Sequence, residues 1–207
     1  MSVIVGHSTR CAKCQILLKN IFIMKRTLLI FILAAFSQVL LGQNVEMCSK
    51  LSSGGVAVRT KDVPYTATAY VDGQSLTSIH RFNVFYSSQP SASGSIVRFK
   101  VISANGWAIA KGAEVSVTYS DGVVAKVNIM EDSSPEEVGA FYQSSISFIV
   151  DDGRLIHLND AASVSVKTSE GSVLEIRFGD NFEDIFSEVY MEMWDELSDK
   201  GWTKTAL

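Results

Sequence analysis

Short runs in which apolar and polar residues alternate fill most of the chain from about residue 55 onward. In one run Val115 and Val117 alternate with serine and threonine, and in another Leu174, Ile176 and Phe178 alternate with charged residues. Side chains two positions apart lie on the same face of a β-strand, so these runs predict strands with one buried and one wet face. That pattern is typical of antiparallel sheets.

Glycine-containing dipeptides separate the alternating runs. Asn-Gly and Asp-Gly accept the positive φ angles that tight hairpin turns require. The dipeptides are Asp72-Gly73, Asn105-Gly106, Asp121-Gly122, Asp152-Gly153 and, with glutamate in place of aspartate, Glu170-Gly171. They predict hairpin turns between neighbouring antiparallel strands.

The stretch SSPEEVGAFYQ predicts a short helix in the middle of the chain. Ser134 suits the N-cap, Pro135 the first helical position and Glu137 the third, which together form a capping box. Gly139 weakens this helix because glycine is a poor helix former.

A stronger helical pattern occupies the C-terminal part of the chain. Asp180 is the expected N-cap and Gly201 the residue just beyond the last turn. The apolar residues form one stripe at helical spacing: Phe182, Ile185, Phe186, Val189, Tyr190, Met193, Trp194 and Leu197. We expect this stripe to pack on strand residues such as Leu174, Ile176 and Phe178; the alternative is that it pairs between subunits.

Residues 114–129 and 163–178 resemble each other at an offset of 49 positions. The identical positions are Val115, Ser116, Val117, Ser120, Gly122 and Val124, which recur as Val164, Ser165, Val166, Ser169, Gly171 and Val173. Self-similarity at a fixed period indicates a repeated structural unit. We therefore predict a tandem strand-then-helix unit over residues 95–143 and 144–200; the alternative is a chance likeness between two hairpins.

These patterns together predict an α+β fold. Most of it is expected to be antiparallel β hairpins or a meander, joined by the short middle helix and the long C-terminal amphipathic helix. Residues 43–54 are expected to be a polar lead-in, and residues 55–207 a single β-rich domain. Apolar residues make up 47% of the chain, which suits a globular core.

Residues 24–42 have the layout of a secretory signal peptide. Lys25 and Arg26 precede an apolar run of about fourteen residues, and Gly42 offers a small residue at the cleavage position. The run is shorter than the roughly 20 residues that span a bilayer, although a membrane-retained helix is the alternative. We expect a bacterial protein, secreted or periplasmic, cleaved between Gly42 and Gln43 or, as second choice, before Gln38. Residues 1–23 are then an over-extended N-terminus, with Met24 as the natural start.

Charge and cysteine content exclude several classes of function. From Gln43 onward the chain has 13 basic and 22 acidic residues, a formal charge of −9, which disfavours nucleic-acid binding. Membrane contact is expected only through the signal peptide during export. Cys11 and Cys14 fall in residues 1–23 and leave Cys48 alone, so we expect no internal disulfide. No metal-ligand or phosphate-loop spacing occurs, and we expect no metal and no cofactor.

Candidate catalytic groups are few. His157 lies close in sequence to Asp151, Asp152 and Asp160, and a carboxylate could orient a histidine that acts as a base. No nucleophile motif accompanies them, and aspartates beside glycine are also common in turns. An ordinary strand histidine is therefore the favoured interpretation of His157.

Aromatic residues in the first half offer a surface for recognition. Tyr65, Tyr70, Tyr86 and Trp107 could present broad apolar faces to a sugar or peptide. They also alternate with polar residues as strand cores do, and that interpretation is favoured. The leading hypothesis is a non-catalytic binding module for a protein, peptide or glycan. The alternatives are a small secreted hydrolase that uses His157, and a structural or assembly protein that pairs through its C-terminal helix.

Overall fold

The computed structural model of the chain describes residues 44–52, 54–89 and 92–202, without the side chains of five of them. Those five are residues 89, 92, 93, 152 and 153. The expected over-extended start, residues 1–23, and the expected signal peptide, residues 24–42, lie outside the described residues. The description below concerns the unit from Gln43 to Leu207.

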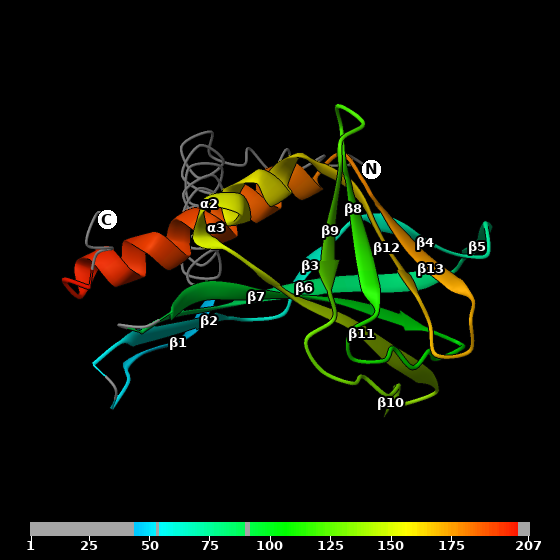
Figure 1. The fold of residues 1–207 in the computed structure, drawn as a ribbon, viewed down its shortest axis with the longest axis horizontal. Helices are drawn as coiled ribbons and strands as arrows, with labels where there is room; N and C mark the ends of the chain where they lie inside the picture. The colour runs from blue at the N-terminus through cyan, green and yellow to red at the C-terminus, as the bar shows by residue number, and fades with distance from the viewer. Residues whose placement is uncertain (1–43, 53, 90–91, 203–207) are drawn as a thin grey trace, which may run out of the picture. The chain divides into compact units, whose positions relative to one another are not determined.

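Sheet A joins seven antiparallel strands in the order β1-β2-β6-β7-β11-β10, with β3 beside β6 (Figure 1). Its strands are β1 (Val45–Lys50), β2 (Val56–Thr60), β3 (Val63–Tyr65), β6 (Ser78–Gln89), β7 (Ala92–Ser103), β10 (Glu136–Val138) and β11 (Phe141–Val150). The expected polar lead-in is thus largely β1, which pairs with β2 from Val45 to Lys50.

Sheet B joins six antiparallel strands in the order β5-β4-β13-β12-β8-β9. Its strands are β4 (Ala67–Val71), β5 (Gln74–Leu76), β8 (Glu114–Tyr119), β9 (Val124–Asn128), β12 (Ala161–Lys167) and β13 (Val173–Phe178). The alternation in the sequence predicts which faces are buried, since Val115, Val117, Leu174 and Ile176 are all at most 2% exposed. The prediction of antiparallel sheets is confirmed.

The inner face of sheet A packs against both α3 (Phe182–Asp199) and sheet B, which lie on the same side of it (Figure 1). Phe82 stacks on Phe186 of α3 at 5.5 Å between ring centroids, and Phe99 contacts Phe178 of β13 at 5.2 Å. These contacts place the buried side chains of both sheets and the helix in one continuous core.

Three of the five glycine dipeptides form the predicted hairpin turns. Gly73, Gly122 and Gly171 have φ of 80°, 85° and 94°, between paired strands. Asn105-Gly106 instead lies in the connection from β7 to β8. A Cβ at Gly106 would stand 2.4 Å from the Cβ of Pro135, so glycine is required there for close packing. Asp152-Gly153 begins α2 (Asp152–Leu155), which leads into the 3₁₀ helix η1 (Ile156–Asp160).

The predicted middle helix is wrong. β10 and the start of β11 form a hairpin there, in which Val138 pairs with Phe141. Gly139 between them has φ of 63°, in the left-handed region. The capping box that begins at Ser134 is a local signal, whereas β11 pairs with β7 along nine positions. Long-range pairing and burial outweigh the weak helical preference of this short segment.

The predicted C-terminal helix is confirmed. The N–H of Gly201 donates to the carbonyl of Ser198, and that of Trp202 to the carbonyl of Leu197, both at 2.8 Å. Gly201 has φ of 66°, so the helix ends as the sequence predicts. At its start Asn181, rather than Asp180, occupies the N-cap position.

The buried part of the helical stripe comprises Phe182, Phe186, Val189, Met193 and Leu197. Tyr190 and Trp194 are only partly buried. Phe182 stacks on Phe178 of β13 at 4.0 Å, whereas Phe186, which was expected to pack on β13, packs on β6 of sheet A. The helix therefore covers sheet A as well as one end of sheet B.

Strands related by the offset of 49 positions pair with each other. Arg98 of β7 stands opposite Ser147 of β11, and Ser116 of β8 stands opposite Ser165 of β12. Each pair joins two positions 49 residues apart, so each antiparallel ladder contains one pair of matching positions of the two predicted repeats. Around such a pair, an antiparallel ladder has an approximate local twofold axis between its two strands.

The two hairpin turns of sheet B also match. The N–H of Gly122 donates to the carbonyl of Tyr119, and the N–H of Gly171 donates to that of Thr168, both at 3.0 Å. The likeness does not extend to the helix, because α3 follows β13 whereas an extended segment and β10 follow β9. The prediction that a helix ends each repeat is therefore wrong for the first one.

Candidate functional site

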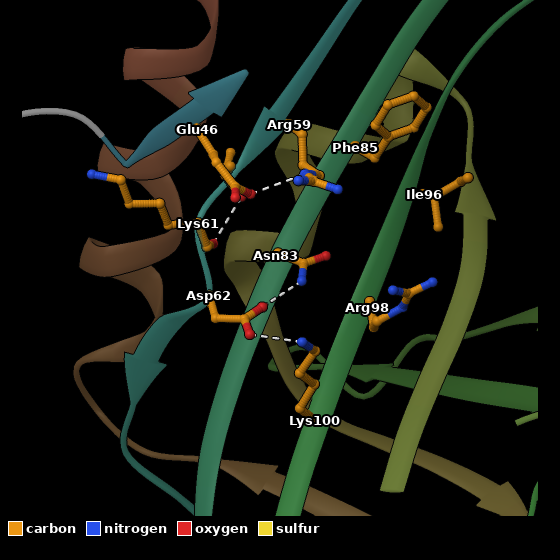
Figure 2. Close-up of a pocket in the computed structure, with 10 residues that line it drawn as sticks. Glu46, Arg59, Lys61, Asp62, Asn83, Phe85, Ile96, Arg98 and Lys100 are labelled. Carbon is orange, nitrogen blue, oxygen red and sulfur yellow. Dashed lines mark hydrogen bonds and ion pairs between the residues drawn. The ribbon is translucent and has the colours of Figure 1, made fainter. Parts of the chain in front are cut away.

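The outer face of sheet A, turned away from α3 and sheet B, carries no described helix or strand packed over it (Figure 1). A groove of about 480 Å³ lies on this face. It is lined by residues of β1, β2, the β2–β3 connection, β6 and β7: Glu46, Arg59, Thr60, Lys61, Asp62, Asn83, Phe85, Ile96, Arg98 and Lys100. Figure 2 shows these side chains on the strands, with α3 at the left of the view, behind β1.

Strand register arranges the groove residues in rows across the sheet. Phe85 of β6 lies between Arg59 of β2 and Ile96 of β7, and Ile149 of β11 continues that row. The row is apolar except for Arg59 at its β2 end. Alternation along each strand explains the arrangement, since Phe85 and Ile96 are the outward neighbours of the buried Tyr86 and Val97.

The next row is polar and is centred on Arg98. Arg98 stands between Asn83 of β6 and Ser147 of β11. Its Nε donates to Ser147 Oγ at 2.9 Å, and its second guanidinium nitrogen, Nη2, donates to Glu131 Oε1 at 2.9 Å. These two hydrogen bonds hold the guanidinium in a defined orientation over the sheet.

Asp62 links the row of Asn83 and Arg98 to the next row, which contains Arg81 and Lys100. Lys100 Nζ lies 2.7 Å from Asp62 Oδ2, and the amide of Asn83 donates to the other carboxylate oxygen (Figure 2). Partial burial acts to raise the pKa of Asp62, but the hydrogen bonds from Lys100 and Asn83 and the charges of Lys100 and Arg81 outweigh it. The pKa of this carboxyl is therefore held below its ordinary value, and Asp62 is ionised at neutral pH.

Basic residues are concentrated on this face. The basic patch consists of Arg59, Lys61, Arg81, Arg98 and Lys100; Arg81 stands opposite Lys100 in the register of β6 and β7. Three carboxylates pair with the patch, namely Glu46, Asp62 and Glu131. The rest of the chain from Gln43 onward has eight basic and nineteen acidic residues, so the patch is a positive region on an acidic protein.

Exposed apolar side chains surround the patch. By strand register, five of them lie on the outer face: Met47, Ile79, Val138, Phe141 and Ile149. Each is at least 37% exposed. An exposed face that combines arginine with apolar side chains is typical of a surface that binds a partner.

The aromatic residues singled out in the sequence mostly belong to the core. Tyr65, Tyr86 and Trp107 are 7%, 2% and 6% exposed, so their rings do not form a recognition surface in this structure. Tyr70 is partly exposed on sheet B, with the guanidinium of Arg177 4.3 Å from its ring centroid. Tyr70 therefore remains the accessible member of the set.

His157 and Asp160 line one open pocket of about 680 Å³ together with Ser120 and Tyr119. His157 lies in η1, so its interpretation as a strand histidine is wrong. It is exposed, and no hydrogen bond joins its ring to a carboxylate or hydroxyl among the described side chains. Asp151 accepts a hydrogen bond from the N–H of Arg154 and caps α2. The side chain of Asp152 lies outside the described part. The structure thus brings part of the predicted set together, without the hydrogen bonds of an assembled catalytic group.

The described residues hold neither a metal-binding cluster nor a membrane-spanning helix. No group of three or more histidine, cysteine, aspartate or glutamate side chains is placed to hold a metal ion in this part of the chain. No helix within it has the length and apolar character to cross a membrane. Cys48 is a free thiol in β1, and partial burial raises its pKa.

No protein-family model matches this chain, and neither does any curated protein or solved structure compared with it.

Sequence reasoning did not find the groove. Arg59, Arg81 and Arg98 lie in three separate stretches of sequence, and each occupies an ordinary outward position of its strand. The sequence shows that these residues are basic, but it does not show that five of the 13 basic residues after Gln43 lie in one patch. Recognising it required the order of the strands, which brings β2, β6 and β7 side by side.

Proposed function

We propose that this protein is an exported, non-catalytic binding module that holds an acidic polymer on the outer face of sheet A. The observation that carries the proposal is the basic patch, which lies on an uncovered sheet face of an otherwise acidic chain. Guanidinium groups bind carboxylates and sulfates through two parallel hydrogen bonds, and Arg59, Arg81 and Arg98 supply three of them.

The groove supports recognition rather than chemistry. Its carboxylates are engaged by Lys100, Asn83 and Arg59, so they serve to position cations. The apolar row beside them gives an extended partner a surface for its less polar groups. The hydrolase alternative has less support, because His157 has no hydrogen-bonded partner among the described side chains.

Binding of defined anionic polymers tests the proposal. Fluorescein-labelled poly-L-glutamate and dextran sulfate are the probes, and neutral dextran is the control polymer. We expect both anionic probes to bind, with affinity that falls as salt rises. The double variant Arg59→Ala/Arg81→Ala should weaken binding about tenfold or more, since arginine contacts at interfaces commonly exceed 1 kcal/mol each.

A matched variant tests whether binding depends on the basic patch or only on the total charge of the protein. Lys111→Ala/Lys126→Ala removes the same charge from exposed positions outside the groove and should leave affinity nearly unchanged. Equal losses in the two double variants, or no binding of either anionic probe by the wild-type protein, would refute the proposal.

We also propose that residues 95–143 and 144–200 descend from one duplicated unit of strands. Support comes from the two ladders that each contain a pair of positions 49 residues apart, and from the matching turns at Gly122 and Gly171. The duplicated part would then comprise β7, β8 and β9 in the first half and β11, β12 and β13 in the second, with α3 belonging to the second half alone.

A further inference from the structure

We propose that the acidic partner of the outer face is helix α3 of a second copy of this chain, so that copies stack head to tail. The inference rests on the proposed function, because it assigns a partner to the same basic patch. It draws on the charge of the two surfaces, their placement in the fold and the spacing of their charged groups.

Helix α3 presents a surface of one sign. It carries seven acidic residues and no basic residue: Glu183, Asp184, Glu188, Glu192, Asp195, Glu196 and Asp199. Asp184, Glu188 and Glu192 follow each other at four-residue spacing, which places like charges next to each other on the helix. Within the described part of the chain, Glu196 pairs with Lys200, and the other six form no ion pair.

The acidic helix and the basic patch lie back to back across the same part of sheet A. The buried Tyr86 of β6 contacts Trp194 of α3, with 4.9 Å between ring centroids, whereas its neighbour Phe85 lines the groove on the other side. Figure 2 shows α3 at the left edge of the groove, behind β1. A second copy displaced along the sheet normal therefore brings its α3 over the groove of the first copy.

The spacing of charges suits this placement. Carboxylates four residues apart on a helix recur every ~6 Å along its axis. Cations two residues apart on a strand, such as Arg98 and Lys100, recur every ~6.8 Å. Met191 lies on the exposed side of α3 with 63% of its surface accessible, and the apolar row of Phe85, Ile96 and Ile149 lies beside the patch.

The contact joins two different surfaces, so it is heterologous and leaves one of each surface free at the ends of the stack. A heterologous contact related by displacement does not close, and it produces open-ended assemblies whose size grows with protein concentration. Because exposed charges carry much of the attraction, the assembly should shrink as salt rises.

Charge-reversal variants provide the test, with the mass distribution measured by sedimentation velocity over a range of concentrations. Every variant keeps the termini of the purified wild-type chain. The helix variant is Asp184→Lys/Glu188→Lys/Asp195→Lys/Asp199→Lys, which leaves three acids and four lysines on α3, and the face variant is Arg59→Glu/Arg81→Glu. We expect the wild type to associate in 20 mM salt and to dissociate in 500 mM salt. Each variant alone should be a monomer, because its two surfaces then carry the same sign.

Mixing the two variants is the decisive measurement. An equimolar mixture restores opposite charges at both contacts, and association should return to at least half of the wild-type mean mass. Asp121→Lys/Glu137→Lys/Asp160→Lys/Glu170→Lys is the matched control, since it reverses four exposed acids outside α3 and the groove and should leave association as in the wild type. A mixture that stays monomeric, or variants that associate like the wild type, would overturn the inference.

The outcome separates this inference from the proposed function. A wild-type protein that is monomeric at every concentration, yet loses poly-L-glutamate binding in the face variant, overturns self-association and leaves the binding function standing. A face variant that still binds the probe overturns the binding function itself. The salt series on the wild type needs no substitution, so misfolding of a variant does not remove the test.

Discussion

His80 is a buried histidine in a strand that otherwise alternates regularly. It is 3% exposed, its Nε2 lies 2.9 Å from Ser78 Oγ, and its Nδ1 has no hydrogen-bond partner in the described residues. The ring of Tyr65 lies 5.7 Å away, and its hydroxyl is also buried without a partner. Burial disfavours the charged imidazolium and therefore lowers the pKa of His80 below its ordinary value.

Acid should destabilise the fold through His80. The unfolded chain takes up a proton near pH 6.5, whereas the folded chain takes it up only at lower pH. The contribution of His80 to stability is therefore complete above that pH and is lost as the pH falls below it, by at most about 1.4 kcal/mol per pH unit. Urea denaturation between pH 7.5 and 5 measures this slope.

The variant His80→Gln keeps an amide near Ser78 but does not titrate, so its slope should be shallower than that of the wild type. His157→Gln is the matched control, because His157 is exposed and its replacement should leave the slope unchanged. Equal slopes in the wild type and His80→Gln would show that His80 is not the titrating group.

At the scale of elements, helix α3 is attached to sheet A mainly through its fully buried side chains. Phe186 is 1% exposed and stacks on Phe82. We expect Phe186→Ala to lower the free energy of unfolding by about 3–5 kcal/mol, because truncation of a buried aromatic leaves a cavity. Chemical denaturation at two protein concentrations in 500 mM salt, where the copies are expected to be separate, measures the loss, which should be the same at both.

Trp194→Ala should cost less than Phe186→Ala, since Trp194 is only partly buried against Tyr86 and Tyr190. Met191→Ala is the control on the exposed side of the same helix and should change stability by no more than about 0.5 kcal/mol. A Phe186→Ala variant as stable as Met191→Ala would mean that the helix does not dock as described.

The comparison of elements shows what local sequence can predict. The alternation around Val115 and Leu174 and the stripe of α3 depend on short-range spacing, and both were correctly predicted. Gly106 was misassigned to a hairpin because its role depends on Pro135, which is distant in sequence. The helix expected at Ser134 failed for the same reason, since pairing with β7 decides the conformation of that segment.

The groove could not be predicted from local spacing at all. Phe85 and Arg98 look like ordinary outward strand residues, and only the strand order places them in one site. By contrast, the histidine and aspartates near residue 157 were noticed because they are close in sequence. Their side chains form no hydrogen-bonded group with His157 in the described part of the structure.

At the scale of the whole molecule, the proposal of export concerns the chain before and after processing. Residues 24–42 have the layout of a signal peptide, and the folded unit begins at about Gln43. Fractionation of the native host followed by intact-mass analysis should find a species that begins at Gln43, or at Gln38, outside the cytoplasm. A full-length cytoplasmic species would contradict export.

The pairing of strands 49 positions apart has a consequence for refolding. The hairpins β6–β7, β8–β9 and β12–β13 form between neighbours in sequence, but β7–β11 and β8–β12 join only after long loops close. Closing these long loops lowers the entropy of the chain before the new contacts stabilise it, so this topology should refold slowly. Until these strands pair, β7 and β8 have unpaired edges, which can pair with β11 and β12 of another chain as well as with those of their own chain. Concentrated refolding should therefore yield dimers that have exchanged halves.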